Sequence, residues 1–272
     1  MTQQPNTKFV VMVLLGEYIR PRGGKIWLSD LLNLLETLNI GERTARSTIT
    51  RMAREDWFTI ERQGRQSKYA ITPFGQKILQ GGDWRLEDSL LTDWDGRWHL
   101  ITYSLPEDIR KLRDHLRKQL SWLGYGRLST GLWLSPHNRQ DEINQIIYTH
   151  KIEQYIHFFQ GTYAGPLTNH QLITQCWNLP DLATQYEQFL NKYEGIPTPK
   201  TLSPKDSFQA RFWLTADLFP ILRQDPNLPQ ALLPTDWIGI QGKRLFYKLR
   251  AQLALKTDCF INEMINGGTA GK

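Results

Sequence analysis

Arginines and hydroxyl side chains recur on one face of a helix predicted over residues 42–55. Alanine, isoleucine and methionine occupy the opposite face, where they can pack against a second helix. Arginine can contact a guanine edge through two hydrogen bonds, and hydroxyls suit bases or phosphates. The pattern is typical of a helix that enters the major groove of DNA, although a solvated helix could show similar residues. The candidate DNA-reading residues are Arg43, Thr44, Arg46, Ser47, Thr50, Arg51 and Arg54.

A second basic group, Arg62, Arg65 and Lys68, surrounds Gly64 in a predicted hairpin, FTIERQGRQSKYAIT. Glycine permits the positive φ that tight turns need. No acidic residue separates Arg62 from Lys68. A basic hairpin placed one element after a basic helix can contact the sugar-phosphate backbone. Together the two features favour nucleic-acid binding, and these three residues complete the candidate interface.

The elements that position these residues are predicted from hydrophobic spacing within residues 1–82. Three helices followed by a hairpin is the order of a winged helix-turn-helix. The same segment holds 12 lysines and arginines against 7 acidic residues, which accounts for +5 of the chain's net charge of +6. This uneven charge is expected of a polyanion-binding module. The expected elements are a helix over 7–19, a helix capped by Ser29 or Asp30, the helix over 42–55, the hairpin, and a short helix near 73–79 that leads to a boundary at Gly81-Gly82.

Residues 98–163 alternate between strand-like and helical segments in the order β-α-β-β-α-β, which is the ferredoxin-like pattern. Beyond them, residues 171–193, 206–223 and 236–257 are predicted to be helical, with a break near Pro180 and Pro-rich connectors. The predicted fold class is α+β. Its three domains are a winged helix-turn-helix at 1–82, a ferredoxin-like domain at 83–170, and a mostly helical domain for dimerisation or effector binding at 171–272.

Basic residues beside aromatic ones in the central and C-terminal segments could bind an anionic ligand with an apolar part. Aromatic residues also commonly form cores, so both interpretations stay open. A basic strip on the first central helix, which includes Arg113 and Arg117, could be a solvated face or a contact for DNA or for a ligand phosphate. The candidate effector-binding residues are Trp133, Arg211, Trp213, Lys243, Arg244 and Tyr247.

The run GERTARSTITRMAREDWFTIERQGRQSKYAIT resembles the N-terminal domain of the PaaX-type repressors of phenylacetate catabolism. The run WDGRWHLITYSLPEDIRKLRDHLRKQLSWLGYGRLSTGLWLSP is similar to that family's middle domain, and CWNLPDLATQYEQFLNKY and DPNLPQALLPTDWIG to its C-terminal domain. The resemblance covers nearly the whole chain in order. It implies a winged-helix repressor with a Cas2-like middle domain, a homodimer on a palindromic operator, and phenylacetyl-CoA as the inducer of founding members.

One departure from the family pattern concerns the run RFWLTADLFPIL. Ala216 and Leu218 stand there where family members often carry polar residues. The domain plan can persist while the ligand changes, because function resides in sites grafted on folds. The inducer of this chain can therefore differ from that of the founding members.

A metal-dependent nuclease built on the Cas2-like segment is the alternative function. Such a site needs a carboxylate near the end of the first strand, where this chain has Tyr103-Ser104-Leu105. Glu107 and Asp108 follow Pro106, a position where acids suit a helix start. The six histidines lack metal-ligand spacing, and the two cysteines are expected to be reduced thiols. We therefore expect no catalytic residues, no metal and no cofactor.

The apolar run at residues 9–15 is too short to span a bilayer and lacks a cleavage site. We therefore expect a cytoplasmic, nucleoid-associated protein that does not act at a membrane. Its expected partners are double-stranded DNA, a second copy of the chain and a small-molecule effector such as an acyl-CoA. A third interpretation is an interaction module whose winged helix binds protein instead of DNA.

Overall fold

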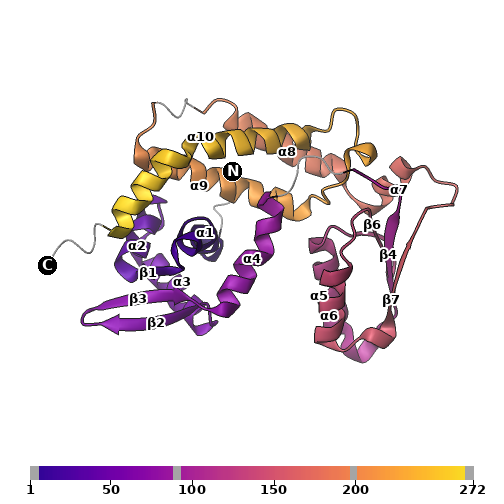
Figure 1. Cartoon of the computed structure of the whole chain (residues 1–272), viewed down its shortest axis with the longest axis horizontal. Coiled ribbons are helices and arrows are strands. Elements are labelled where there is room, and N and C mark those ends of the chain that lie inside the picture. Colours follow the sequence, from indigo (N-terminus) through magenta and orange to yellow (C-terminus); the bar gives the residue numbers. More distant parts are fainter. Residues whose placement is uncertain (1–5, 88–92, 197–200, 267–272) are drawn as a thin grey trace. The chain divides into compact units, whose positions relative to one another are not determined.

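The computed structural model describes residues 6–87, 93–196 and 201–266 and combines many helices with two antiparallel sheets (Figure 1). The chain forms two compact units. The first consists of Met1–Asp88, Lys192–Phe219 and Arg244–Lys272, and the second of Ser89–Asn191 and Pro220–Lys243. Within the described ranges, no helix combines the length and apolar character needed to cross a bilayer.

The N-terminal part of the first unit begins with helices built on apolar residues. Asn6 caps the first of them, because its side chain accepts a hydrogen bond of 2.9 Å from the N–H of Lys8. The elements up to residue 54 are α1 (Thr7–Leu14), the π-helical turn η1 (Leu15–Ile19), the 3₁₀ turn η2 (Arg20–Arg22), β1 (Lys25–Trp27), α2 (Leu28–Thr37) and α3 (Glu42–Arg54).

The predicted cap of α2 is wrong. Strand β1 leads directly into the helix, so Trp27 is the N-cap residue, and Ser29 and Asp30 lie inside the first turn. Asp30 is only 3% exposed, and its carboxylate accepts a hydrogen bond from the Ser29 hydroxyl. Burial raises the pKa of Asp30 above its ordinary value, and the Ser29 hydrogen bond partly opposes this shift.

The predicted hairpin is present as β2 (Phe58–Gln63) and β3 (Gln66–Ile71). Gln63 pairs with Gln66, which leaves a two-residue turn in which Gly64 has a φ of 60°. Glycine adopts this positive φ without steric cost. Strand β1 pairs with the other edge of β3, so the order in this sheet is β1-β3-β2.

Helix α4 (Pro73–Glu87) continues through Gly81 and Gly82, so the prediction that the two glycines end a short helix is wrong. A Cβ placed on Gly82 would lie 3.1 Å from Cζ of Phe219. The missing side chain therefore lets α4 approach the aromatic ring closely, which is a packing role that glycine can take inside a helix.

Two C-terminal helices, α9 (Pro204–Gln224) and α10 (Ile238–Asn266), contribute to the core of the first unit. Phe208, Phe212 and Ala216 of α9 and Ile261 of α10 cluster with the apolar residues of α1, α2 and α3. The Phe208 ring lies 5.4 Å from the Tyr18 ring in an edge-to-face arrangement. The N-terminal helices and hairpin therefore share one core with later parts of the chain.

The second unit contains the β-α-β-β-α-β order that the sequence predicts. Its strands pair in the antiparallel order β5-β6-β4-β7, which is a ferredoxin-like arrangement. Helices α5 and α6 lie on one face of this sheet (Figure 1), where Leu116, Leu120 and Ile143 pack on Ile101. The elements are β4 (Trp98–Tyr103), η3 (Glu107–Ile109), α5 (Arg110–Trp122), β5 (Gly126–Ser129), β6 (Leu132–Ser135), α6 (Gln140–His150), η4 (Glu153–Tyr155) and β7 (Ile156–Gly161).

Two further helices, α7 (Asn169–Cys176) and α8 (Leu179–Tyr193), follow with the predicted break between them. The C-terminal segment of this unit includes the 3₁₀ turn η5 (Gln230–Leu232) and is anchored by a buried polar cluster. Asp225 accepts a hydrogen bond from the Tyr186 hydroxyl at 2.6 Å and lies 3.0 Å from Nζ of Lys243. Burial alone would raise the pKa of Asp225, but Lys243 and the hydrogen bonds hold it below its ordinary value.

Candidate nucleic-acid interface

Helix α3 presents its polar face to solvent as the sequence predicts. All seven predicted DNA-reading residues of this helix are exposed. Ala45, Ile49 and Met52 are buried in the core, together with Thr48, whose burial the residue pattern did not reveal. Ala53, expected on the inner face, is only half-buried. The buried side chains fix the rotation of the helix, so the arginine face points outward.

The ionic contacts of α3 leave most of its arginines unpaired. Arg46 donates from Nε to the Glu42 carboxylate at 2.7 Å. At the end of the helix, Lys8 forms an ion pair with Glu55. Within the described part of the chain, Arg43, Arg51 and Arg54 have no ion pair or hydrogen bond. Three guanidinium groups on this face are therefore available for an external anion.

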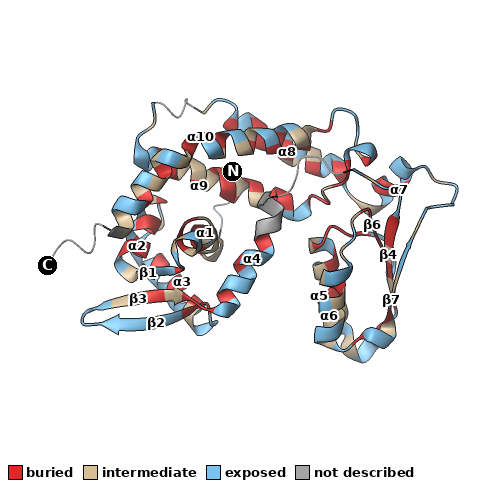
Figure 2. Ribbon diagram, in the orientation of Figure 1, coloured by how far each residue is buried: buried red, intermediate tan, exposed pale blue. Residues whose placement is uncertain are grey.

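The hairpin β2–β3 carries the second predicted basic group. Arg62 near the end of β2 and Arg65 in the turn are exposed, and most of β2 is exposed in Figure 2. Lys68 is half-buried, with its Nζ 5.3 Å from the centre of the Trp27 ring, so it also braces the sheet. Ile60 is 45% exposed on β2, an apolar contact point that the analysis of charge did not single out.

The C-terminal helices of the first unit contact the elements that precede α3 in the chain. Gln209 of α9 donates a hydrogen bond to the carbonyl of Thr37 at the end of α2. Arg250 of α10 donates to both carboxylate oxygens of Glu17, at 3.0 and 2.9 Å. These contacts link η1 and the end of α2 to α9 and α10. The exposed arginines of α3 and the hairpin form a surface of hydrogen-bond donors that suits binding to a polyanion.

Comparisons with known proteins extend over almost the whole chain. Residues 6–75 match a family described as PaaX-like protein, residues 91–173 match the PaaX protein central Cas2-like domain, and residues 177–263 match the PaaX-like protein C-terminal domain. The transcriptional repressor PaaX of Escherichia coli (strain K12) is 28% identical over 262 residues, which cover 93% of this chain and 82% of that protein. The chain belongs to the PaaX-type family.

A solved structure supports the fold of this PaaX-type protein. The uncharacterized protein Rv0674 from Mycobacterium tuberculosis matches with a TM-score of 0.64 and 22% sequence identity. The match covers 94% of this chain and 99% of the other. The predicted division into three domains at residues 82 and 170 stays a prediction. The two compact units are a different division of the chain, in which each unit includes part of the C-terminal third.

The six predicted effector residues of the PaaX-type chain are divided between the two units. In the second unit, Trp133 is 4% exposed, and Lys243 is engaged by Asp225 and by the Asn227 side chain at 2.7 Å. In the first unit, Arg211 lies 5.7 Å from the Tyr18 ring, and Trp213 packs edge-on against Phe212. Arg244 is exposed, and Tyr247 lies 5.3 Å from the Phe246 ring. Their role in effector binding stays a prediction.

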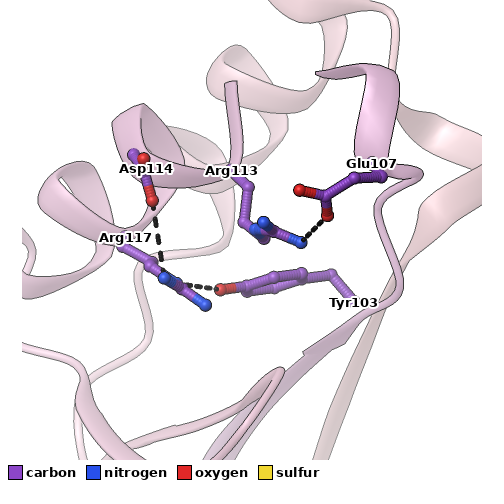
Figure 3. Close-up of polar contacts among 5 residues, drawn as sticks. All are labelled: Tyr103, Glu107, Arg113, Asp114 and Arg117. Atoms are coloured by element: carbon purple, nitrogen blue, oxygen red, sulfur yellow. Dashed lines mark hydrogen bonds and ion pairs between the residues drawn. The ribbon is translucent and has the colours of Figure 1, made fainter. Parts of the chain in front are cut away.

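The alternative function, a metal-dependent nuclease, would depend on acidic residues of the central Cas2-like domain. Glu107 forms an ion pair with Arg113 at 3.1 Å, and Arg117 contacts the Tyr103 hydroxyl and Asp114, each at 3.4 Å (Figure 3). Among the described residues, no three histidine, cysteine, aspartate or glutamate side chains gather as metal ligands do. Both cysteines, Cys176 and Cys259, are free. The observed contact of Glu107 is therefore to an arginine of the following helix.

Proposed function

We propose that this chain is a DNA-binding transcription regulator, a repressor of the PaaX type. Its first unit would act as a winged helix-turn-helix, in which α3 enters the major groove and the β2–β3 hairpin contacts the backbone. The observation that carries the proposal is the exposed arginine face of α3, where Arg43, Arg51 and Arg54 have no partner within the described residues. The kinship with a protein named as a transcriptional repressor supports the same function.

The finer proposal is that a cytoplasmic homodimer binds a palindromic operator and is released by a small-molecule effector. A two-fold dimer would place its two α3 helices on half-sites about 34–36 Å apart, one turn of DNA. An effector that binds the DNA-free state more tightly would lower operator affinity by shifting the population of states. No catalytic step is needed for this function.

Selection of duplexes from a random library, followed by fluorescence anisotropy with the selected site, tests the function. We expect a two-fold symmetric site and an affinity that falls steeply with salt, since arginines displace counterions from phosphates. Sedimentation of the complex should show two chains for each site. Absence of duplex affinity at low salt would overturn the proposal and would favour a protein-binding module.

A further inference from the structure

The second unit contains a cavity of about 470 Å³ whose walls come from α5, β5, β6, the α7–α8 junction and the end of α9. Three arginines line it: Arg117, Arg127 and Arg223. No acidic side chain is among its lining residues. Small-molecule sites are commonly cavities of this size, with mostly apolar walls and a few polar groups that fix the ligand.

The arginines of this cavity are weakly neutralised. Arg117 contacts the Tyr103 hydroxyl and the Asp114 carboxylate only at 3.4 Å each (Figure 3). Arg223 lies 5.6 Å from the Trp122 ring, and Arg127 has no hydrogen bond or ion pair within the described residues. Like charges that line one space repel each other, and an anion between them removes that repulsion. Guanidinium groups pair with carboxylates and phosphates through parallel hydrogen bonds.

The wall also contains a buried indole that can donate a hydrogen bond. Trp133 is 4% exposed, and its indole Nε1 has no hydrogen-bond partner among the described residues. A buried donor is stabilised when an acceptor reaches it. Tyr125 and Trp177 add aromatic surface to the same cavity. The walls therefore combine donors for an acceptor-rich anion with flat surfaces for a planar apolar group.

We propose that this cavity binds an anion, a carboxylate or a phosphate ester, that carries a planar apolar group. Arg127 and Arg223 bind the charged group, and the aromatic wall holds the planar group. Binding at this site does not depend on the proposed regulatory function. The further statement that this ligand is the effector of the regulator rests on the proposed function.

Cys176 provides a reporter, because it lines the cavity and Cys259 is the chain's only other cysteine. Burial raises the pKa of the Cys176 thiol to about 12, so its alkylation is slow and easily timed. In a Cys259→Ser variant of the full chain, without DNA, alkylation of Cys176 is followed by mass spectrometry. The probes are 1-naphthaleneacetate, 1-naphthyl phosphate and the neutral 1-naphthaleneacetamide, each at millimolar concentration. We expect at least one anion to slow alkylation several-fold and the amide to have no effect.

Arginine variants identify the charged contacts. Arg127→Gln and Arg223→Gln should each weaken binding of the protective anion about tenfold, as loss of a charge-assisted hydrogen bond does. Arg97→Gln, an exposed arginine of the same unit outside the cavity, is the matched control and should bind normally. Circular dichroism and the thermal midpoint verify folding of each variant. Comparison of 1-naphthaleneacetate with 1-naphthyl phosphate shows whether the site prefers a carboxylate or a phosphate ester.

Three results would overturn the proposal: no protection by either anion, equal protection by the amide, or unchanged binding in both cavity variants. Because this experiment contains no DNA and the operator experiment contains no ligand, failure of one does not imply failure of the other. If the cavity binds its anion and the anion also releases DNA, the ligand is an effector. If it binds without releasing DNA, the site stands and its regulatory role is rejected.

Discussion

Arg46 and Glu42 form an ion pair one helical turn apart on α3, with Nε of Arg46 2.7 Å from the carboxylate. Their side chains are 52% and 67% exposed, so the pair adds little to stability, about 0.2–1 kcal/mol at most. On a DNA-binding face the same pair has a larger consequence. It places a carboxylate beside the arginines that would approach phosphates, and it neutralises one of those arginines.

Replacing Glu42 with glutamine should therefore strengthen binding to every duplex, about 3- to 10-fold at low salt, because one repulsive charge is removed. Anisotropy titrations at several salt concentrations measure the change. Glu36→Gln, which removes an exposed carboxylate from α2, is the matched control. If both variants gained equally, net charge alone would explain the gain and the role of Glu42 at the interface would be rejected.

Arg46→Ala and Arg65→Ala should differ in kind. Arg46 lies on the helix that would contact base edges, so its loss should cost about 1–3 kcal/mol at one operator position and relax the preference there. Arg65 lies in the hairpin turn, so its loss should weaken all duplexes alike and lower the salt slope by about one. Affinities for the operator and for single-base variants separate the two effects.

Arg97→Ala provides the control for loss of a surface arginine, because Arg97 is exposed in the second unit. Its affinity for operator and mutated duplexes should equal that of the unchanged protein. Indistinguishable profiles for Arg46→Ala and Arg65→Ala would contradict the division of labour between helix and hairpin.

Two glycines of the second unit should respond differently to replacement by alanine. A Cβ on Gly126 would lie 2.5 Å from Cε2 of Trp177 and 2.6 Å from Cβ of Cys176, so Gly126→Ala should destabilise by about 1–3 kcal/mol through overpacking. Gly161, at the end of β7, has open space around its Cα, so Gly161→Ala should be nearly neutral. Urea denaturation compares the midpoints, and equal shifts would show that Trp177 can move aside without cost.

The orientation of α3 could be predicted from sequence because it depends on spacing within one helix. Ala45, Ile49 and Met52 repeat at three- and four-residue intervals, and a helix with this pattern has one possible inner face. The hairpin could be predicted in the same way, because Gly64 marks its turn locally. Both predictions needed only neighbours in the chain.

What could not be predicted depends on contacts between distant residues. At Gly82, which lies inside α4, a side chain would crowd the ring of Phe219, far along the chain, and no local signal reveals this contact. Lys243 was a candidate ligand residue because it is basic and close to aromatic residues, but Asp225 and Asn227 engage it. The arginines of the cavity come from α5, β5 and α9, so their proximity appears only in the folded chain.

Lys243→Met should test whether this lysine serves the fold. It is 8% exposed and its partner Asp225 is 4% exposed, so the substitution removes the Lys243–Asp225 ion pair from a buried site, at a cost of about 3–5 kcal/mol near pH 7. In the unchanged protein the pKa of Asp225 is below its unfolded value of about 3.9, so its stabilisation is constant above about pH 5 and lost only as pH falls further. In the variant, burial should raise the pKa of Asp225 in the folded state above its value in the unfolded state. The destabilisation of the variant should therefore shrink as pH falls from 7 to 5.

Urea melts from pH 7 to 5 measure the difference, with Lys248→Met, an exposed lysine of the same helix, as control. A loss of stability below 1 kcal/mol, or one independent of pH, would return Lys243 to the set of residues available for a ligand.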